Sequence, residues 1–474
     1  MDRFADVLDR LVTTTQRNGK IRLLANYFSS TPDPDRGFAL AALTDGLPMS
    51  FPMRRVLQEI MEPHVDPLLY RLSRDYVGDT AETVALLWRN RPEQGKAPRL
   101  SEVIETLKRT SKRELPKVVA SLLDQLDANG RWALLKFLGG ALRVGVSARL
   151  AKIALAQGMG VPVEEIEEAW HGLAPPYTDL FQWLEGRAPK PDPGQRPIFR
   201  PVMLAHPIED GDFASLKPED LVAEWKWDGI RVQIASVGEQ VRVFSRAGDD
   251  ISGGFPDVAQ AFFGRHGVLD GELLIVKDGE VRPFNDLQQR LNRKSVTEGM
   301  IEQYPAHVRL YDLLFDGPED IRGLSFAERR RRLEDWFTRA RPVAADVSEI
   351  VMIDSFEALE GLWNRTRESG IEGLMLKRLQ SPYLAGRPKG HWFKWKRAPL
   401  IADCVLMYAQ RGSGKRSSYY SDYTFGAWRQ AEAGKDELVP VGKAYSGFTD
   451  EELITLDRWI RNNTIERFGP VRSV

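Results

Sequence analysis

The feature that most constrains this 474-residue chain is a change of hydrophobic pattern at one proline-rich stretch. The stretch is APKPDPGQRP, residues 188–197, and its prolines remove backbone donors and favour extended chain. Before it, apolar residues recur at helical spacing, and after it short runs alternate as strands do. The pattern predicts an all-α region over residues 1–190 and an α+β region with antiparallel sheets over residues 198–397.

Helical spacing is clearest at two places in the N-terminal region. Apolar residues three and four positions apart occur at Phe4, Val7, Leu8 and Leu11, and again at Val103, Ile104 and Leu107. Short breaks such as TPDPDRG and NGR separate these segments. We therefore expect a bundle of helices with few strands.

A third pattern follows the segment WFKWKR. The runs ADCVLMYAQ, YTFGAWR and ELVPVGKAY are typical of short strands, and SGFTDEELITLDRWIRNN is typical of a helix. Thr449 is placed to cap that helix, with Glu452 at its third position. Residues 398–474 are thus predicted to form a small β-barrel with one helix. Only one further β-like stretch precedes Val474, so we expect an incomplete barrel.

Composition excludes several classes of protein. The 66 basic and 67 acidic residues give a formal net charge of −1, which argues against a supercharged nucleic-acid tail or an acidic disordered protein. A single cysteine, Cys404, excludes a disulfide framework and a cysteine-rich zinc module. No run of 18 apolar residues exists, and MDRFADVLDRL lacks the apolar core of a signal peptide. We expect no membrane span and a cytoplasmic location.

The segment KWDGIR, residues 226–231, is the first candidate for chemistry. A strand ending at Lys226 and turning at Asp228–Gly229 would project an amine and, from Arg231, a guanidinium at the mouth of one hairpin. A lysine amine becomes a nucleophile when a cationic neighbour or desolvation lowers its pKa. An ordinary hairpin with a surface lysine explains the same residues equally well.

Other polar residues recur inside or at the ends of apolar strand patterns further along the chain. They are Arg246, Glu272, Tyr311, Glu372, Lys394 and Lys396. Charges in such positions cost free energy unless they are paired or bind something. Taken singly, Glu272 could be a satisfied carboxylate at a strand end, Tyr311 a core residue, and the two lysines a solvated face. A separate structural explanation for each of these six residues, in this order along the chain, is much less simple than one shared site.

This ordered set resembles the nucleotidyltransferase superfamily of ATP-dependent DNA ligases, RNA ligases and mRNA capping enzymes. RWALLKFLGGALRVGVSARLAKIALA is similar to the helical DNA-binding domain of ATP-dependent DNA ligases, and GSGKRSSYYSDYTFGAW with VGKAYSGFTDEEL is similar to their OB-fold. The resemblance is to the bacterial three-domain type. It implies a DNA-binding domain over residues 1–190, an ATP-grasp-like nucleotidyltransferase domain over residues 198–397, and a C-terminally truncated OB-fold over residues 398–474.

The resemblance also implies roles for residues around the nucleotide. Lys226 would attack the α-phosphorus of ATP and carry AMP as a phosphoramidate. Glu224 would accept a hydrogen bond from the adenine amino group, and Tyr311 would stack on the adenine. Glu272 would hold the ribose and help bind Mg²⁺ or Mn²⁺, for which Glu372 would be the second ligand.

Basic residues complete the implied nucleotide site. Lys394 and Lys396 would contact the α-phosphate and offset developing charge. Arg231 and Arg246 would hold AMP or the phosphate at a nick. The family also has an arginine shortly before the paired lysines, and Arg387 is the nearest match, one residue away from the family's spacing.

Two further basic segments have simpler explanations. GSGK at 412–415 does not match a phosphate-binding loop, because Ala409 stands where glycine is needed and Arg416 where serine or threonine is needed. A turn between strands of the barrel, in reach of a DNA backbone, is the better explanation. The run from Arg329 to Arg332 is expected to be a solvated helix face paired to Glu328 and Glu334, with contact to DNA as the lesser alternative.

A third basic group lies in the helical region. It comprises Lys108, Arg109, Lys112 and Arg113, for which contact with DNA phosphates and plain solvation are equally good explanations. The six histidines show no metal-ligand spacing.

The chain is therefore expected to be a monomeric ATP-dependent DNA ligase of the bacterial nucleoid, acting on nicked duplex DNA. An RNA ligase or capping enzyme would not need the long helical region, and an NAD-dependent ligase would ordinarily carry a cysteine zinc module. A non-catalytic DNA-binding scaffold remains the alternative from another class. The family's final basic motif is not found before Val474. We accordingly expect poor self-adenylation, with sealing of a pre-adenylated nick retained.

Overall fold

The computed structural model describes residues 1–474 except 45, 48, 50, 90–96, 141, 171–172, 192–195, 210, 214–215, 367–370, 398–400, 413–417, 431–435 and 446. The expected linkers near 190 and 398 and the GSGK segment lie wholly or partly outside the described residues. The chain divides into two compact units, one of residues 1–159, 174–178 and 400–474, the other of residues 160–173 and 179–399. The finer division into three domains stays a prediction.

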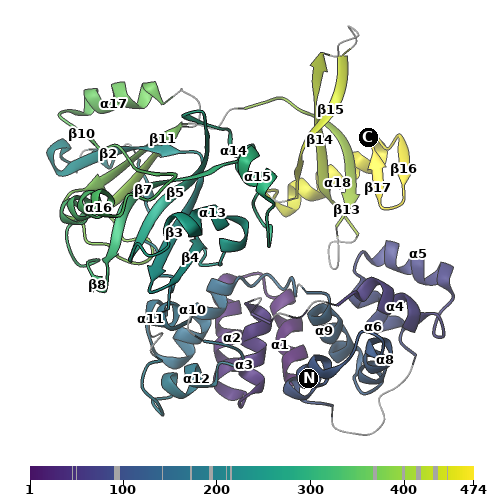
Figure 1. Ribbon diagram of the computed structural model, residues 1–474. Coiled ribbons are helices and arrows are strands. Elements are labelled where there is room, and N and C mark those ends of the chain that lie inside the picture. Colours follow the sequence, from purple (N-terminus) through teal and green to yellow (C-terminus); the bar gives the residue numbers. More distant parts are fainter. Residues whose placement is uncertain are drawn as a thin grey trace. The chain divides into compact units, whose positions relative to one another are not determined.

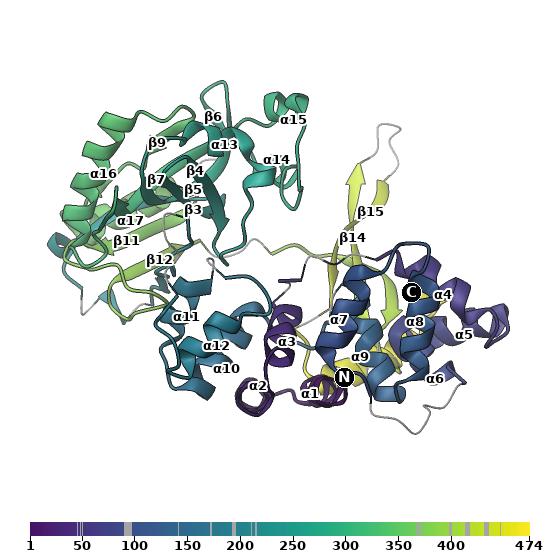
Figure 2. The same ribbon diagram turned by 60° about the horizontal axis from the view of Figure 1, so that its bottom comes forward.

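The N-terminal part of the first unit is helical, as predicted (Figure 1). Its helices are α1 (Asp2–Thr13), α2 (Arg17–Ser30), α3 (Asp35–Leu43), α4 (Met53–Met61), α5 (Pro67–Val77), α6 (Thr80–Leu87), α7 (Leu100–Arg109), α8 (Leu115–Asp124), α9 (Ala128–Leu138) and α10 (Ala148–Met159). The apolar stripe of α1 is buried, which is why this segment folds as an amphipathic helix. In Figure 2, α7, α8 and α9 lie side by side, in agreement with their contacts.

Helix α5 differs from its neighbours because none of its residues is buried. Asp66 caps its N-terminus by accepting hydrogen bonds from two backbone N–H groups, and Gly78 ends it in the left-handed region at φ 74°. Helices α11 (Val163–Trp170) and α12 (Thr178–Leu184) follow α10 in the chain, and most of their residues belong to the second unit.

Two sheets make up most of the second unit. The first has the strand order β1-β12-β11-β2-β10, and the second has the order β4-β3-β5-β7-β8, with β6 paired to β5 and β9 paired to β7. The strands are β1 (His206–Pro207), β2 (Leu221–Trp227), β3 (Ile230–Val237), β4 (Gln240–Ser245), β5 (Gly267–Lys277), β6 (Glu280–Val281), β7 (Ala306–Asp316), β8 (Glu319–Asp320), β9 (Ala345–Val347), β10 (Val351–Met352), β11 (Ile371–Arg378) and β12 (Trp392–Lys396). Pairing is antiparallel as expected, except that β1–β12 and β7–β9 are parallel.

The two sheets pack on each other and are covered by helices. Val222 of the first sheet packs with Ala235 and Val268 of the second in the core between them. Helix α17 (Phe356–Arg365) covers the outer face of the first sheet (Figure 1), where its leucines pack against β11. Around the second sheet lie α13 (Pro256–Ala261), α14 (Phe284–Gln288), α15 (Glu298–Gln303) and α16 (Phe326–Ala340). This layered α+β arrangement agrees with the prediction.

The hairpin predicted at KWDGIR is wrong. Strand β2 pairs with β10 and β11, whereas β3 pairs with β4 and β5. The chain therefore leaves one sheet and enters the other at Asp228–Gly229. A two-residue connection is a strong hairpin signal in sequence, but here each strand finds better partners in its own layer.

The C-terminal segment forms a third sheet, part of the first unit, with one helix. Strands β13 (Val405–Arg411), β14 (Tyr420–Gln430), β15 (Asp436–Ala444), β16 (Glu466–Phe468) and β17 (Val471–Ser473) pair antiparallel in the order β15-β14-β13-β17-β16. Helix α18 (Asp450–Asn462) has the predicted capping box between Thr449 and Glu452. Two strands follow α18 rather than the single stretch expected, and the pairings of the described strands leave β15 and β16 at the edges.

Candidate active site

A cavity of about 300 Å³ in the second unit gathers all the predicted nucleotide-binding side chains. Its lining includes Glu224, Lys226, Arg231, Arg246, Glu272, Tyr311, Arg387, Lys394 and Lys396. Strands of both sheets contribute, so residues far apart in sequence meet where the layers face each other. Eight basic residues and only two carboxylates line this cavity, which suits a polyanionic ligand.

Lys226 lies near the end of β2 and contacts Glu372 of the neighbouring β11. Its Nζ donates to the Glu372 Oε2 atom at 2.5 Å, and the Lys396 Nζ approaches the same oxygen at 2.8 Å. Partial burial acts to raise the pKa of Glu372, but hydrogen bonds from the two lysines outweigh it and keep that pKa below its usual range. The carboxylate is therefore ionised beside the amine.

The backbone of β11 explains why Glu372 reaches Lys226. The register of β11 against β2 shifts between Ile371 and Gly373, so Glu372 lies at a bulge that aims its side chain. Gly373 has φ 154°, and a Cβ there would come within 2.1 Å of the Trp395 carbonyl oxygen. Only glycine fits at this approach of β12 to β11.

Glu272 reaches the cavity from the second sheet. On β5 it stands opposite Arg231 of β3 and Arg309 of β7. Burial raises the pKa of Glu272 to about 7, against the opposing effect of nearby cations. Burial, followed by the repulsion of Glu372, also raises the pKa of Asp228. These carboxylates repel one another when ionised, and a bound cation would reduce that repulsion.

Glu224 is buried deeper in the same cavity, with its side chain 3% exposed. Its Oε2 atom pairs with the Lys377 Nζ at 2.7 Å, and its Oε1 atom has no hydrogen-bond partner among the described residues. Arg330 NH1 lies 3.7 Å from Oε1. Burial raises the pKa of Glu224, and the charge of Lys377 opposes that rise. The Oε1 atom keeps its capacity to accept a hydrogen bond from an amino group when the carboxyl is ionised.

Tyr311 and Arg231 form another part of the lining. The Arg231 guanidinium lies 5.7 Å from the Tyr311 ring centroid and donates to Asp270 at 2.5 Å and to Tyr383 Oη at 2.9 Å. It also donates to the Met203 carbonyl oxygen at 2.5 Å. Arg231 is thus anchored by protein partners. Burial raises the pKa of the Tyr311 phenol well above its ordinary value, so the ring is neutral.

Three cations at this cavity make no ion pair within the described part of the chain. They are Arg246, Arg387 and Lys394. Burial lowers the pKa of Lys394, and the charges of Arg387, Lys396, Arg246 and Lys226 lower it further. An anion would relieve this mutual repulsion.

Sequence reasoning gave no role to two cations that line the cavity. Lys377 ends the apolar run LMLK, and a lysine at the end of a buried strand was the available signal. Arg309 stacks over the Trp227 ring, 4.3 Å from its centroid, and forms a bidentate pair with Asp346. Nothing in the local sequence marks that contact.

The expectation for the run from Arg329 to Arg332 is half wrong. Arg329 is fully buried and pairs with the equally buried Asp312 at 2.9 Å, and Arg330 is 9% exposed. Arg331 and Arg332 are paired to Glu328, and Arg330 to Glu334, as expected. A helix of this pitch turns Arg329 and Arg330 toward the protein interior while Arg331, one position further, faces water.

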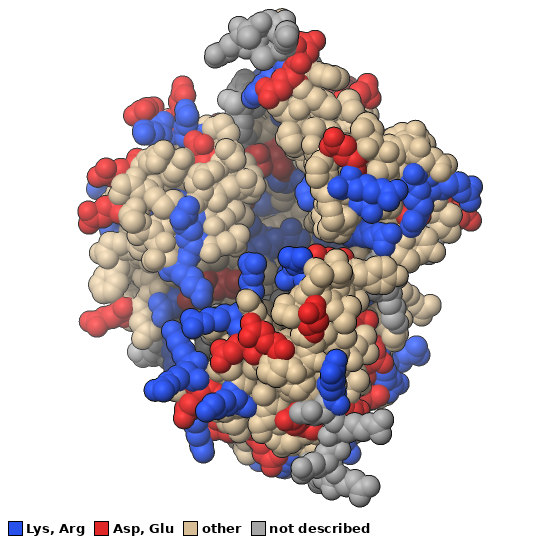
Figure 3. Space-filling view, turned by 90° about the vertical axis from the view of Figure 1, so that its right-hand side faces the viewer, with Lys and Arg blue, Asp and Glu red and all other residues tan. Residues whose placement is uncertain are grey.

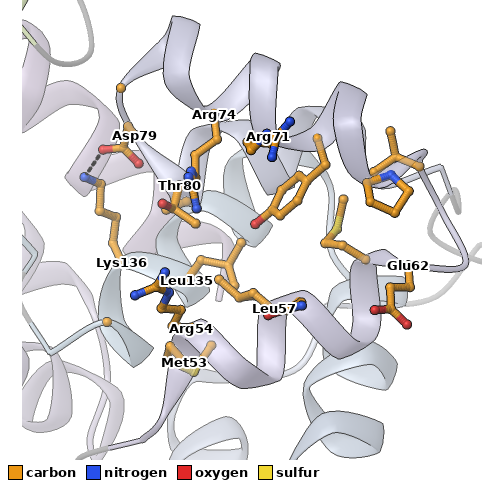
Figure 4. Close-up of a pocket in the computed structure, with 18 of the residues that line it drawn as sticks. Met53, Arg54, Leu57, Glu62, Arg71, Arg74, Asp79, Thr80, Leu135 and Lys136 are labelled. Carbon is orange, nitrogen blue, oxygen red and sulfur yellow. Dashed lines mark hydrogen bonds and ion pairs between the residues drawn. The ribbon is translucent and has the colours of Figure 1, made fainter. Parts of the chain in front are cut away.

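The helical region contains a second, larger cavity of about 760 Å³ that the sequence did not predict. It lies between α4, α5, α6 and α9 and is lined by Arg54, Arg71, Arg74, Lys136 and Arg143 together with methionine and leucine side chains (Figure 4). Lys136 pairs with Asp79, the cap of α6. The predicted DNA-contact residues lie elsewhere: Lys108 and Arg109 end α7 and pair with Glu105, and Lys112 and Arg113 are exposed in the following turn.

Charges elsewhere on the surface are mixed. The face drawn in Figure 3 carries basic side chains interspersed with acidic ones, in keeping with the near-zero net charge. Within the described residues, no three His, Cys, Asp or Glu side chains converge as a metal-binding group. None of the described helices has the length and apolar character needed to cross a bilayer.

Comparison with known proteins identifies the family. The family described as the ATP dependent DNA ligase domain matches residues 202–396, the span that builds the cavity. A probable DNA ligase of Koribacter versatilis is 29% identical over all of this chain and 87% of its own length. The chain belongs to the ATP-dependent DNA ligase family.

Other members of this ligase family are similar over part of their length. A probable DNA ligase of an Anaeromyxobacter species is 35% identical over 72% of this chain and 66% of its own length. DNA ligase 1 of Korarchaeum cryptofilum is 33% identical over 73% of this chain and 63% of its own length. The chain thus spans just under two thirds of these two relatives. The solved structure named Pmar-Lig_Pre. shares the fold, with a TM-score of 0.55 at 15% identity over 97% of this chain and 91% of that one.

Proposed function

We propose that this chain seals nicks in duplex DNA through a covalent lysyl-AMP intermediate. The observation that carries the proposal is the single cavity in which Lys226 meets Glu224, Glu272 and the paired lysines of β12. The remaining domain assignments belong to the same proposal. Residues 1–190 bind DNA, residues 198–397 form the nucleotidyltransferase domain, and residues 398–474 form an OB-fold.

The first step is transfer of AMP from ATP to Lys226. The uncharged amine forms a bond from Nζ to the α-phosphorus while the bond from that phosphorus to the pyrophosphate oxygen breaks. The ammonium must first lose a proton, and Glu372 is the carboxylate in contact with it. In the next two steps the nick's 5′-phosphate takes AMP from Lys226, and the 3′-hydroxyl then expels AMP to form the phosphodiester.

The other cavity residues bind and orient the nucleotide. Glu224 accepts from the adenine amino group, Tyr311 stacks on the base, and Glu272 holds the ribose. Lys394 and Lys396 balance charge that develops on the α-phosphate. These roles are supported by where the side chains lie in the cavity.

Basic residues outside this core serve the phosphates. Arg246 and Arg387 contact AMP or the phosphate at the nick, since neither makes an ion pair within the described residues. Arg231 acts mainly by fixing the cavity wall, because its two terminal nitrogens already donate to protein partners.

A divalent cation, Mg²⁺ or Mn²⁺, fits beside Glu272 and Glu372. Mg²⁺ commonly keeps several waters and takes one or two protein carboxylates, so two glutamates suffice without a three-residue group. When bound there, the ion would neutralise phosphate charge.

DNA contact is assigned to basic surfaces of the helical region. The predicted residues Lys108, Arg109, Lys112 and Arg113 are exposed, and the arginines around the larger cavity offer further phosphate contacts (Figure 4). Contacts of this kind position a protein on DNA without reading its sequence. The proposed ligase acts as a monomer on nicked DNA in the bacterial nucleoid. An RNA ligase has no evident need for the helical region, and a scaffold has no need for an intact Lys226–Glu372 pair.

The test is incubation with α-labelled ATP and Mg²⁺ followed by a denaturing gel, for the unaltered chain and for Lys226→Ala. Weak label on the unaltered chain and none on Lys226→Ala is the expected result, because self-adenylation is expected to be poor. Sealing of a pre-adenylated nick in duplex DNA is measured alongside, with an RNA nick for comparison. Failure to retain label together with failure to seal either nick would contradict the proposal and favour the scaffold.

A further inference from the structure

Lys377 is a buried cation that the reaction described above does not use. It lies on β11 with its side chain 2% exposed, and its Nζ is 4.5 Å from the Tyr311 ring centroid, 4.8 Å from that of Phe326 and 4.7 Å from that of Trp392. Its ion-pair partner is Glu224, at 2.7 Å. A lysine held among three aromatic rings by one carboxylate needs an explanation other than stability, because buried ion pairs rarely stabilise a fold more than apolar residues of the same size.

Glu224 is braced from two sides by cations. Lys377 pairs with its Oε2 atom from β11, and Arg330 of α16 approaches its Oε1 atom at 3.7 Å. The next charge is Asp312 of β7, which the buried Arg329 neutralises. Burial raises the pKa of Glu224 above its ordinary value, and the neighbouring cations Lys377 and Arg330 limit that rise and so favour the ionised form.

With the base placed against Glu224 as proposed above, the protonation state of this carboxyl would decide which purine is bound. An ionised carboxylate only accepts hydrogen bonds, so it fits the 6-amino group of adenine and repels the 6-oxo group of guanine. A protonated carboxyl can donate to that oxo group, so it would no longer discriminate between adenine and guanine. Sites built around one buried hydrogen bond reject the wrong partner strongly, by factors on the order of 10⁴ or more.

We infer that Lys377, assisted by Arg330, is a positioning residue that keeps Glu224 a pure acceptor and so makes the site select ATP over GTP. It acts through Glu224 and does not touch the reacting atoms. This assignment rests on the proposed function only for the location of the base in the cavity. The Oε1 atom of Glu224 has no hydrogen-bond partner among the described residues, and it would accept from the adenine amino group and repel the guanine oxo group.

The experiment measures dissociation constants of ATP and GTP between pH 6 and 9, in EDTA so that no adenylate forms. Lys377→Met is compared with the unaltered chain and with Lys277→Met, the same change at an exposed position on β5. We expect the unaltered chain and Lys277→Met to prefer ATP equally at every pH. In Lys377→Met the preference falls at least about tenfold at pH 6 and recovers as rising pH ionises Glu224. Lys377→Arg restores the preference at all pH values.

The pH dependence separates positioning from general damage, because a merely distorted pocket would lose ATP and GTP affinity together at every pH. A Lys377→Met preference within about threefold of the unaltered chain from pH 6 to 9 would overturn the inference. If that variant does not fold, the pH dependence of the unaltered chain still tests the inference. A preference for ATP over GTP that stays constant down to pH 6 supports the inference, and a preference that is lost on acidification overturns it. A chain that binds neither nucleotide contradicts this inference and the proposed function together, whereas selective ATP binding with an unchanged variant overturns the role of Lys377 alone.

Discussion

Two arginines of α16, two residues apart, have opposite environments. Arg329 and its partner Asp312 are both fully buried, whereas Arg331 and its partner Asp335 are 60% and 54% exposed. Removing one partner of a buried pair strands the other charge at a cost of about 3–5 kcal/mol, and an exposed pair contributes at most about 1 kcal/mol. Asp312→Asn should therefore lower the free energy of unfolding by about 3–5 kcal/mol, and Asp335→Asn should leave it nearly unchanged. Urea unfolding of both variants checks this, and equal losses would contradict the assignment.

For single residues, the sequence predicted which side chains belong to the nucleotide site better than it predicted which charged side chains are buried. Glu272, Lys394 and Lys396 stood out because charges rarely lie inside apolar strands without a purpose, and the structure brings them to one cavity. Arg329 could not be separated from Arg331 by the same reasoning. Its burial depends on Asp312, which reaches it from another element through the packing of α16 on β7.

The passage from β2 to β3 is the element on which the cavity depends most. A Cβ at Gly229 would lie 2.6 Å from the Leu273 carbonyl oxygen and 2.9 Å from Glu272 Cγ, so only glycine allows β5 to approach this closely. Gly229→Ala should cost about 1–3 kcal/mol of stability and weaken ATP binding by displacing Glu272. Urea unfolding and ATP titration measure the two effects. Gly361→Ala on α17, where the added methyl meets open space, should leave both unchanged or slightly raise stability.

Helices α3 and α7 are joined by Asp35. Its side chain accepts from the Ser101 backbone N–H at 3.0 Å and from Arg99 Nε at 3.2 Å. Partial burial acts to raise the pKa of Asp35, but these hydrogen bonds prevail and the pKa lies below its ordinary value. A depressed pKa means that the ionised form stabilises the fold above the unfolded pKa of about 3.9, and that this contribution is lost as the pH falls through the folded value.

Asp35→Asn should consequently destabilise the chain by about 1 kcal/mol at pH 7. The difference from the unaltered chain should persist down to about pH 5 and shrink toward pH 3. Denaturant unfolding across this pH range provides the measurement, with Asp9→Asn on the exposed face of α1 as the matched control. A difference that grows on acidification would have the wrong sign for this mechanism.

The kinds of element were predictable, but the sheet to which each strand belongs was not. Helical periodicity placed Phe4 and Leu8 correctly in a core, and alternation identified β3 and β5 as strands. The two-residue link at Asp228–Gly229 predicted a hairpin because local spacing carries no information about distant partners. Strand β2 pairs with β11, some 150 residues later, and that competition is decided by packing between layers.

The nucleotide cavity belongs to only one of the two compact units of the chain. Every residue that lines it lies between Leu204 and Lys396. Bound ATP should therefore slow amide hydrogen exchange in the strands of residues 221–396 and leave α1 to α9 unchanged in the absence of DNA. At about 100 times its dissociation constant, the ligand stabilises the state that binds it by about 2.7 kcal/mol. Exchange measured by mass spectrometry tests this, and protection spread evenly over the chain would contradict it.

Because the chain passes from one sheet to the other at Asp228, the reaction depends on the distance between the two sheets. The nucleophile Lys226 belongs to one sheet and Glu272 to the other, and the distance between them is set by side chains such as Val222, Ala235 and Val268 that never meet a substrate. The volume of those apolar side chains sets the distance between the two sheets. Adding or removing a methyl group in this interior layer would retune the reaction from a distance, so evolution can adjust rate here without altering any residue that binds ATP.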